Sequence, residues 1–188
     1  MIRLVHLGAI LIPADRYRES HIQISEIMTE IKYKQIGIIH SPFKEPKGTP
    51  IQPTAAKGIN GTVEVFQEYT EGLKDLDGFS HIVLIFHFHL SKESSLKVKP
   101  FLDDQTHGVF STRAPTRPNP IGISVVQLVK IDGNILRVQD LDIIDGTPLL
   151  DIKPYIPEFD VRDVTKKGWL EKNVSKRLKL KDDGRFIK

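Results

Sequence analysis

From Tyr33 onward the chain consists of short apolar runs separated by segments rich in proline and glycine. The strongest run, residues 81–90, is apolar on both faces and rich in β-branched and aromatic side chains, which favours a strand. Many short strands with few long helices favour an antiparallel sheet that closes on itself. We therefore predict a mainly β fold, a single-sheet antiparallel β-barrel with short helices and long Pro-rich loops. Further strands are expected at 35–41, 61–66, 109–110, 121–131 and 135–143, with a hairpin turn at Asp132-Gly133.

The first 32 residues differ from this pattern. Apolar side chains recur there at helical intervals, at Ile24, Ile27, Met28 and Ile31. The apolar stretch 7–12 is short, and we interpret it as a strand or helix segment and not as a signal peptide. No apolar run is long enough to predict a transmembrane helix. We expect three parts: an N-terminal extension (1–32), a barrel domain (33–160) and a basic C-terminal tail (161–188).

Charge is distributed unevenly along the sequence. Residues 162–188 hold ten Lys/Arg and four Asp/Glu, a net charge of +6, whereas the whole chain has a net charge of only +3. A basic tail on a slightly acidic body suggests contact with a polyanion, although a solvated surface segment has the same composition. The sequence has no cysteine, which excludes disulfides and Cys-ligated metal sites and is consistent with a cytoplasmic location.

A proline-rich loop, residues 108–122, presents two guanidinium groups. Its sequence is G-V-F-S-T-R-A-P-T-R-P-N-P-I-G, in which the prolines fix φ and stiffen the backbone around Arg113, Arg117 and Asn119. A stiff loop loses little conformational entropy on binding, and guanidinium groups suit phosphates, carboxylates and flat bases. The loop is therefore a candidate binding site. The alternative is a surface loop whose arginines pair with local acids.

A second candidate segment, residues 139–151, is rich in aspartate. Alternation along a strand would place Asp140 and Asp142 on one face, with Leu141 on the other. Asp145 begins a D-G-T-P sequence that is typical of a turn. These carboxylates suit metal binding, acid–base catalysis or the hydroxyl groups of a ribose, but turn formation alone also explains Asp145.

Three histidines offer a different chemistry. His81, His87 and His89 recur at even spacing on the strand predicted at 81–90, and two histidines at i and i+2 can ligate zinc. A third ligand could also come from His107 or from an aspartate. A zinc hydrolase is therefore one alternative function, and a non-catalytic RNA-binding barrel is another. The common nucleotide-binding and hydrolase motifs, such as G-x-G-x-x-G and H-E-x-x-H, do not occur.

Four segments of the chain resemble one known family. They are I-G-I-I-H-S-P-F-K at 36–44, G-F-S-H-I at 78–82, S-T-R-A-P-T-R-P-N-P-I-G at 111–122 and D-L-D-I-I-D-G-T-P-L-L-D-I-K-P-Y-I-P at 140–157. Their order and spacing are similar to those of the S-adenosyl-L-methionine (SAM) dependent tRNA threonylcarbamoyladenosine methyltransferases, the TrmO or TsaA-like proteins. The resemblance covers residues 33–160. It implies a β-barrel homodimer that transfers a methyl group from SAM to the exocyclic nitrogen of the modified adenosine 3′ of the tRNA anticodon.

The resemblance also implies the residues that bind SAM: Pro53, Thr54, Ala55, Leu90, Ser91, Arg113, Ile123, Gln139, Asp140, Leu141 and Asp142. The loop itself suggests the catalytic residues on the substrate side. Arg117 and Asn119 lie four and six residues beyond Arg113, across two prolines, and are expected to point away from the cofactor. Asp145 is a candidate general base on the substrate side, and no metal is expected.

Overall fold

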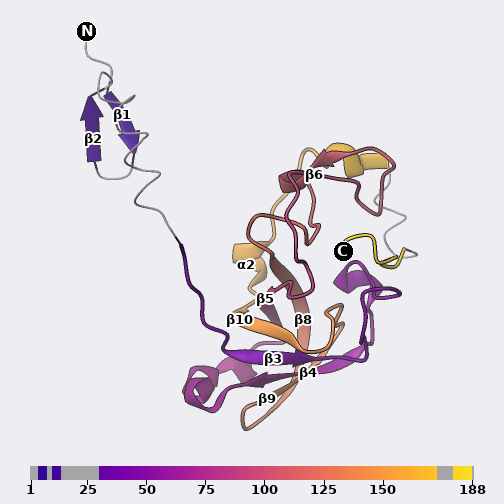
Figure 1. Ribbon diagram of the computed structural model, residues 1–188. Helices are drawn as coiled ribbons and strands as arrows, with labels where there is room; N and C mark the ends of the chain where they lie inside the picture. The colour runs from indigo at the N-terminus through magenta and orange to yellow at the C-terminus, as the bar shows by residue number, and fades with distance from the viewer. Residues whose placement is uncertain (1–3, 8–9, 14–29, 173–179, 188) are drawn as a thin grey trace. The chain divides into compact units, whose positions relative to one another are not determined.

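The structure is a computed structural model that describes residues 4–7, 10–13, 30–172 and 180–187 (Figure 1). Contacts divide the chain into two units, Met1–Lys34 and Gln35–Lys188. In the first unit, strand β1 (Leu4–Leu7) pairs antiparallel with β2 (Ile10–Pro13). The apolar positions Ile24, Ile27 and Met28, on which the helical spacing depends, lie outside the described residues.

Six strands of the second unit form a closed antiparallel barrel, which confirms the predicted fold class (Figure 1). Around the barrel the strands follow the order β10, β3, β4, β9, β8 and β5, and β5 pairs with β10 to close it. Their bounds are β3 Gly37–His40, β4 Asn60–Val65, β5 His81–His87, β8 Ile121–Asp132, β9 Ile135–Gln139 and β10 Thr147–Pro154.

The hairpin between β8 and β9 forms where it was predicted. Asp132 pairs with Ile135, and Gly133 between them has a φ of 61°. This left-handed conformation suits glycine because it has no Cβ.

Other strand predictions were wrong. Residues 109–110 belong to a 3-10 helix (Val109–Ser111), in which Val109 is buried and its carbonyl accepts the N–H of Thr112. Strand β9 ends at Gln139 and not at residue 143, because Asp140 takes a φ of 67° and turns the chain out of the sheet.

Side chains alternate across the barrel wall. On β8, Ser124 and Val126 face the interior and are buried, whereas Ile121 and Ile123 face outward and are exposed. The interior is filled by apolar side chains from every strand of the barrel: Ile39, Val63, Val65, Ile82, Leu84, Phe86, Val126, Leu128, Leu136, Val138 and Leu149.

The long connection between β5 and β8 and the C-terminal end form a smaller apolar cluster outside the barrel. Val98, Val109 and Ala114 are buried there, and Phe186 packs against them. In this connection β6 (Lys97–Val98) pairs with β7 (His107–Gly108). The remaining described elements are the 3-10 helices Pro53–Ala55, Gln67–Leu73, Leu76–Gly78 and Gly168–Lys172, and helix α2 (Pro157–Asp160).

The C-terminal residues return to the loop that follows β3. The N–H of Gly48 donates to the carbonyl of Asp182 at 2.7 Å, and the N–H of Asp182 donates to the carbonyl of Thr49 at 2.9 Å. The predicted division into 1–32, 33–160 and 161–188 stays a prediction. Among the described residues, no helix has the length and apolar character needed to cross a membrane.

Candidate active site

A cavity of about 600 Å³ lies where several loops meet the end of strand β5. That size is within the usual range for small-molecule sites. Its walls come from residues that are far apart in the sequence, in the segments 46–52, 86–91, 100–115, 142–147, 169–170 and 182–187. Most of the lining surface is apolar, and its ionisable side chains are His89, Arg113, Asp142 and Asp182.

Aromatic side chains at the end of β5 form part of the cavity wall. The rings of Phe86 and Phe88 meet edge to face with centroids 5.2 Å apart. Gly122 on the neighbouring strand makes room for them, since a Cβ at this position would lie 2.3 Å from the Phe86 ring. The backbone N–H of Phe88 donates to the carbonyl of Pro120 at 2.7 Å, which fixes this wall to the proline-rich loop.

Asp142 brings a carboxylate into the same cavity. Its Oδ1 accepts a hydrogen bond of 2.6 Å from the hydroxyl of Ser124. Burial raises the pKa of Asp142 to about 6, although the Ser124 hydrogen bond and the charge of Arg113 act in the opposite direction. Asp142 therefore changes its charge close to neutral pH.

His89 lies on the cavity wall just beyond β5. Its Nδ1 is 3.4 Å from the hydroxyl oxygen of Thr147, whose own proton is donated to the carbonyl of Ile144 at 2.7 Å. The Thr147 oxygen therefore acts as the acceptor for an Nδ1–H, and Nε2 of the neutral ring keeps its lone pair. Burial, and secondly the charge of His87, lower the pKa of His89. A neutral imidazole with a free Nε2 can accept a proton.

The two arginines of the proline-rich loop have different surroundings. Arg113 lines the cavity. Arg117 turns back on its own loop, where its Nη1 donates to the carbonyls of Thr112 and Ala114, both at 3.2 Å. The guanidinium group of Arg117 thus holds the backbone on either side of Arg113. The loop is further fixed by the hydroxyl of Ser91, which donates to the carbonyl of Pro115 at 3.1 Å.

Four of the residues predicted to bind the methyl donor line this cavity: Leu90, Ser91, Arg113 and Asp142. Pro53, Thr54 and Ala55 form a short 3-10 helix directly after the lining residues Ile51 and Gln52.

The other predicted binding residues lie elsewhere. Leu141 is fully buried in the barrel core, and Ile123 is on the outer face of β8 with 56% of its surface exposed. Gln139 bonds with Asn60 through its side-chain amide, at 3.2 Å.

Asp140 does not share a strand face with Asp142, so that prediction was wrong. The carboxylate of Asp140 accepts the N–H of Gly58 at 2.7 Å and thereby fixes the turn before β4. Its positive φ interrupts the alternation on which the prediction depended.

The expected substrate-side residues are not among the residues that line the cavity. Asp145 accepts hydrogen bonds from the Lys44 ammonium at 2.7 Å and from the N–H of Ser41 at 3.0 Å, and these two contacts lower its pKa. A carboxylate so stabilised in its charged form is a weak base. Asn119 is exposed, and its carbonyl accepts the N–H of Ile121.

The three histidines considered as zinc ligands have different surroundings. His81 bonds with the neighbouring hydroxyl of Ser80 at 3.0 Å, β5 ends at His87, and the chain then turns to place His89 at the cavity. Within the described ranges, no group of three or more His, Asp or Glu side chains is arranged to hold a metal ion.

Several cavity residues were missed from the sequence. Phe86 and Phe88 occupy alternate positions near the end of a predicted strand, and this spacing could have placed both on one face. Trp169 and Asp182 lie in the segment predicted to be a basic tail, where no local pattern marks them as cavity residues.

The comparisons with known proteins agree with one another. The profile of the tRNA-methyltransferase O N-terminal domain matches residues 38–161. A probable S-adenosyl-L-methionine-binding protein of Pyrococcus abyssi is 67% identical over 157 residues, which cover 84% of this chain and 85% of the relative. The tRNA (adenine(37)-N6)-methyltransferase of Escherichia coli is 39% identical over 140 residues, which cover 69% of this chain and 60% of the enzyme. The crystal structure of TrmO from Pseudomonas aeruginosa superimposes with a TM-score of 0.63 at 37% identity, over 75% of this chain and 62% of that one.

Proposed function

The chain belongs to the tRNA-methyltransferase O family, and from this membership we propose that it transfers a methyl group from SAM to N6 of adenosine 37 in tRNA. The finer proposal is that the acceptor base already carries a threonylcarbamoyl group on this nitrogen. The observation that carries the proposal is that Arg113, Asp142 and Phe86 line one cavity. All three lie within or close to the segments that resemble the family.

The cavity suits the chemical groups of SAM. Its methionine end carries a carboxylate and an ammonium group, its sulfur is a cation, and its adenine is flat and aromatic. Arg113 can receive the carboxylate through two parallel hydrogen bonds, and ionised Asp142 favours a positive charge nearby. The aromatic and apolar wall suits the flat adenine ring.

SAM supplies an electrophilic methyl group on its sulfonium. The acceptor nitrogen of a threonylcarbamoyl group is a weak nucleophile because it is acylated as a urea, and it must lose its proton when the new N–C bond forms. Nε2 of His89 is the cavity atom best suited to receive that proton, because the Nδ1 side of the ring is directed at Thr147. Positioning of the two reactants in the cavity supplies the remaining acceleration.

The basic residues of the C-terminal region are the proposed contact for tRNA. Residues 162–188 carry a net charge of +6, and phosphate contacts give most of the affinity in such complexes. A cytoplasmic location follows from a tRNA substrate and stays a prediction.

A homodimer is part of the proposal as well. The outer face of the barrel exposes Ile121 and Ile123 on β8, and in the proposed dimer a second copy covers them. The predicted contact between Ile123 and SAM would then involve the cavity of the second copy, because Ile123 is not among the residues that line the cavity of its own copy.

The proposal is tested by calorimetry and a methylation assay. Protein treated with EDTA should bind SAM, and it should methylate threonylcarbamoylated tRNA in preference to the same tRNA without the modification. Protein that binds SAM only after zinc is restored would overturn the proposal in favour of the zinc hydrolase. Equal methylation of both tRNAs would support the methyltransferase activity but contradict the proposal that the acceptor base carries a threonylcarbamoyl group.

A further inference from the structure

The C-terminal segment, defined as residues 168–172 and 180–187, lines the cavity although it lies beyond the residues 38–161 that match the family profile. From the sequence this segment was predicted to be a basic tail for polyanion contact. Its contribution to the cavity wall includes an indole and a carboxylate. Contacts with other parts of the chain hold both groups in position. The side chains concerned are Trp169, Leu170, Asp182, Phe186 and Ile187.

Trp169 is held by two contacts with the connection between β5 and β8. Its indole stacks on the imidazole of His107 with centroids 4.6 Å apart and planes inclined by 17°. Its Nε1–H donates to the carbonyl of Ser111 at 2.9 Å. Ser111 lies two residues before Arg113, so the indole is fixed beside the loop that presents this arginine to the cavity.

Residues 180–187 are fixed at two places. On one side, the backbone of Asp182 exchanges hydrogen bonds with Gly48 and Thr49, beside the bridge between Pro50 and Lys181. Further along, the ring of Phe186 meets that of Phe101 edge to face at 5.1 Å.

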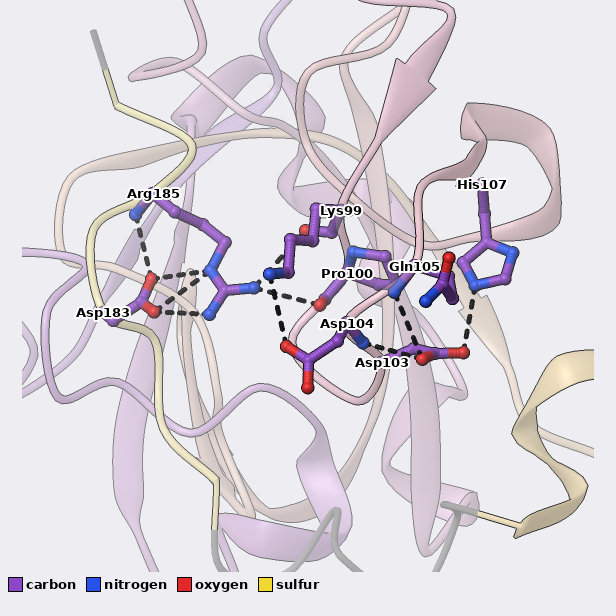
Figure 2. A network of polar contacts seen from close by, with 8 residues as sticks. All are labelled: Lys99, Pro100, Asp103, Asp104, Gln105, His107, Asp183 and Arg185. Carbon is purple, nitrogen blue, oxygen red and sulfur yellow. Dashed lines mark hydrogen bonds and ion pairs between the residues drawn. The ribbon is translucent and has the colours of Figure 1, made fainter.

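Arg185 strengthens the second attachment, as Figure 2 shows. The guanidinium group is held by the carboxylate of Asp183 and donates to the carbonyl of Pro100 at 3.0 Å. It also lies 4.8 Å from the centroid of the Phe101 ring, within the range of a cation–π contact. These contacts position Asp182 between two anchored neighbours.

The carboxylate of Asp182 lines the cavity and is partly buried. Its Oδ1 accepts the N–H of Gly184 at 2.7 Å, and its Oδ2 accepts no hydrogen bond from the part of the chain that the structure describes. Burial, and also the charge of Asp183, raise the pKa of this carboxyl. A partly buried carboxylate favours a ligand that brings a positive charge or a hydrogen-bond donor.

We propose that the C-terminal segment completes the methyl-donor site, with Trp169 as a wall of the cavity and Asp182 as the carboxylate that binds the ammonium group at the methionine end of SAM. This inference rests on the proposed function, because it assigns two further binding residues to the same cavity. It gives the segment a role in cofactor binding that does not depend on tRNA.

Trp169 is the only tryptophan of the sequence, so fluorescence excited selectively at tryptophan, and not at the four tyrosines, reports on this wall. Titration of the full chain with SAM, in the absence of tRNA, should change the Trp169 emission with the same midpoint that calorimetry gives. Asp182→Asn should weaken SAM binding by about tenfold or more, since one charge-assisted hydrogen bond has that effect. Asp163→Asn is the matched control, because it removes the same charge from an exposed position of the C-terminal region that does not line the cavity.

A second variant keeps the test decisive if Asp182→Asn fails to fold. Trp169→Ala leaves the attachments of residues 180–187 intact and should weaken SAM binding at least fivefold. If wild type binds SAM by calorimetry but its emission does not change, and both variants bind as Asp163→Asn does, the inference is overturned while the proposed function stands. If wild type binds no SAM at all, the proposed function itself fails.

Discussion

The hydroxyl of Ser124, on the inner face of β8, donates a 2.6 Å hydrogen bond to the carboxylate of Asp142, eighteen residues further along the chain. This contact brings an ionisable group from the loop after β9 against the interior of the barrel. Burial raises the pKa of that group from its ordinary 3.8 to about 6. Both the charge of the cavity and the stability of the protein should therefore depend on pH through Asp142.

The first prediction concerns stability. Because folded Asp142 holds its proton more tightly than the unfolded chain does, the unfolded chain ionises first as pH rises. The free energy of unfolding should consequently fall between about pH 4 and pH 6, by about 3 kcal/mol in total, and this loss should persist above pH 6. Asp142→Asn should remove this pH-dependent loss of stability. The variant should therefore be more stable than wild type at pH 8, whereas near pH 4 it should have no such advantage. Urea unfolding at both pH values measures this.

The same variant separates stability from binding. SAM affinity of wild type should rise as pH increases through 6, whereas Asp142→Asn should bind weakly and lose most of this dependence. If the variant shows the same dependence of SAM affinity on pH as wild type, another group, such as His89, causes that dependence.

The second prediction concerns proton transfer. If Nε2 of His89 receives the proton, the rate constant of single-turnover methylation should fall when pH drops below the lowered pKa of this residue, because the protonated ring cannot act as a base. His89→Gln should reduce that rate constant by roughly 10²–10⁴-fold and abolish the acidic limb of the profile. SAM affinity, measured in parallel, should change much less. A variant that keeps the acidic limb would exclude His89 as the base.

The third prediction separates the two arginines. Arg113→Ala should weaken SAM binding by roughly ten- to a hundredfold, because a charge-assisted hydrogen bond contributes about 1.5–3 kcal/mol. Arg117→Ala should instead lower the free energy of unfolding by about 1–2 kcal/mol, since it removes the hydrogen bonds to Thr112 and Ala114, and Arg117→Lys should restore only part of that stability.

Calorimetry and urea unfolding of the arginine variants decide between two roles for Arg117. Should Arg117→Ala keep both stability and SAM affinity but lose methylation, this arginine faces the acceptor nucleotide, as the sequence suggested.

The fourth prediction concerns the packing between Gly122 and Phe86. Gly122→Ala places a methyl group 2.3 Å from the Phe86 ring, and relief of this overlap requires the ring to move. Overpacking of this kind costs about 1–3 kcal/mol, so we expect a lower unfolding midpoint together with weaker SAM binding. Gly72→Ala is the control, because nothing lies within 4 Å of its added Cβ. Equal unfolding midpoints and equal SAM affinities in the two variants would mean that the Phe86 ring moves aside at no cost.

The fifth prediction concerns tRNA. Lys166 and Lys167 are exposed and lie just before the segment that lines the cavity. Replacing both with serine should weaken tRNA binding and reduce the slope of log affinity against log salt by about 0.7–0.9 for each phosphate that the protein no longer neutralises. SAM binding should not change. Lys74→Ser, at an exposed position of a different loop, serves as the control, and a salt slope identical in both proteins would contradict a role for these lysines in binding phosphate.

How far the sequence predicts this structure depends on the range of the interactions concerned. The β8–β9 hairpin was predictable because an Asp-Gly pair determines its own turn. The strand at β5 was predictable because the strand preference of β-branched and aromatic side chains is local. The end of β9 was not, since the positive φ of Asp140 is stabilised by its contact with Gly58, 82 residues earlier in the sequence.

For the site, the resemblance of short motifs to a family supplied Leu90, Ser91, Arg113 and Asp142, which the fold gathers at one cavity. The sequence by itself thus determined a β-barrel, the stiff loop and the family, because backbone preference and motif identity are local properties. Only the tertiary structure decided that Arg117 turns back on its loop, that His89 faces Thr147, and that the C-terminal segment lines the cavity. Those placements depend on burial and on contacts between distant residues, such as the stack of Trp169 on His107, which form only when the chain closes on itself.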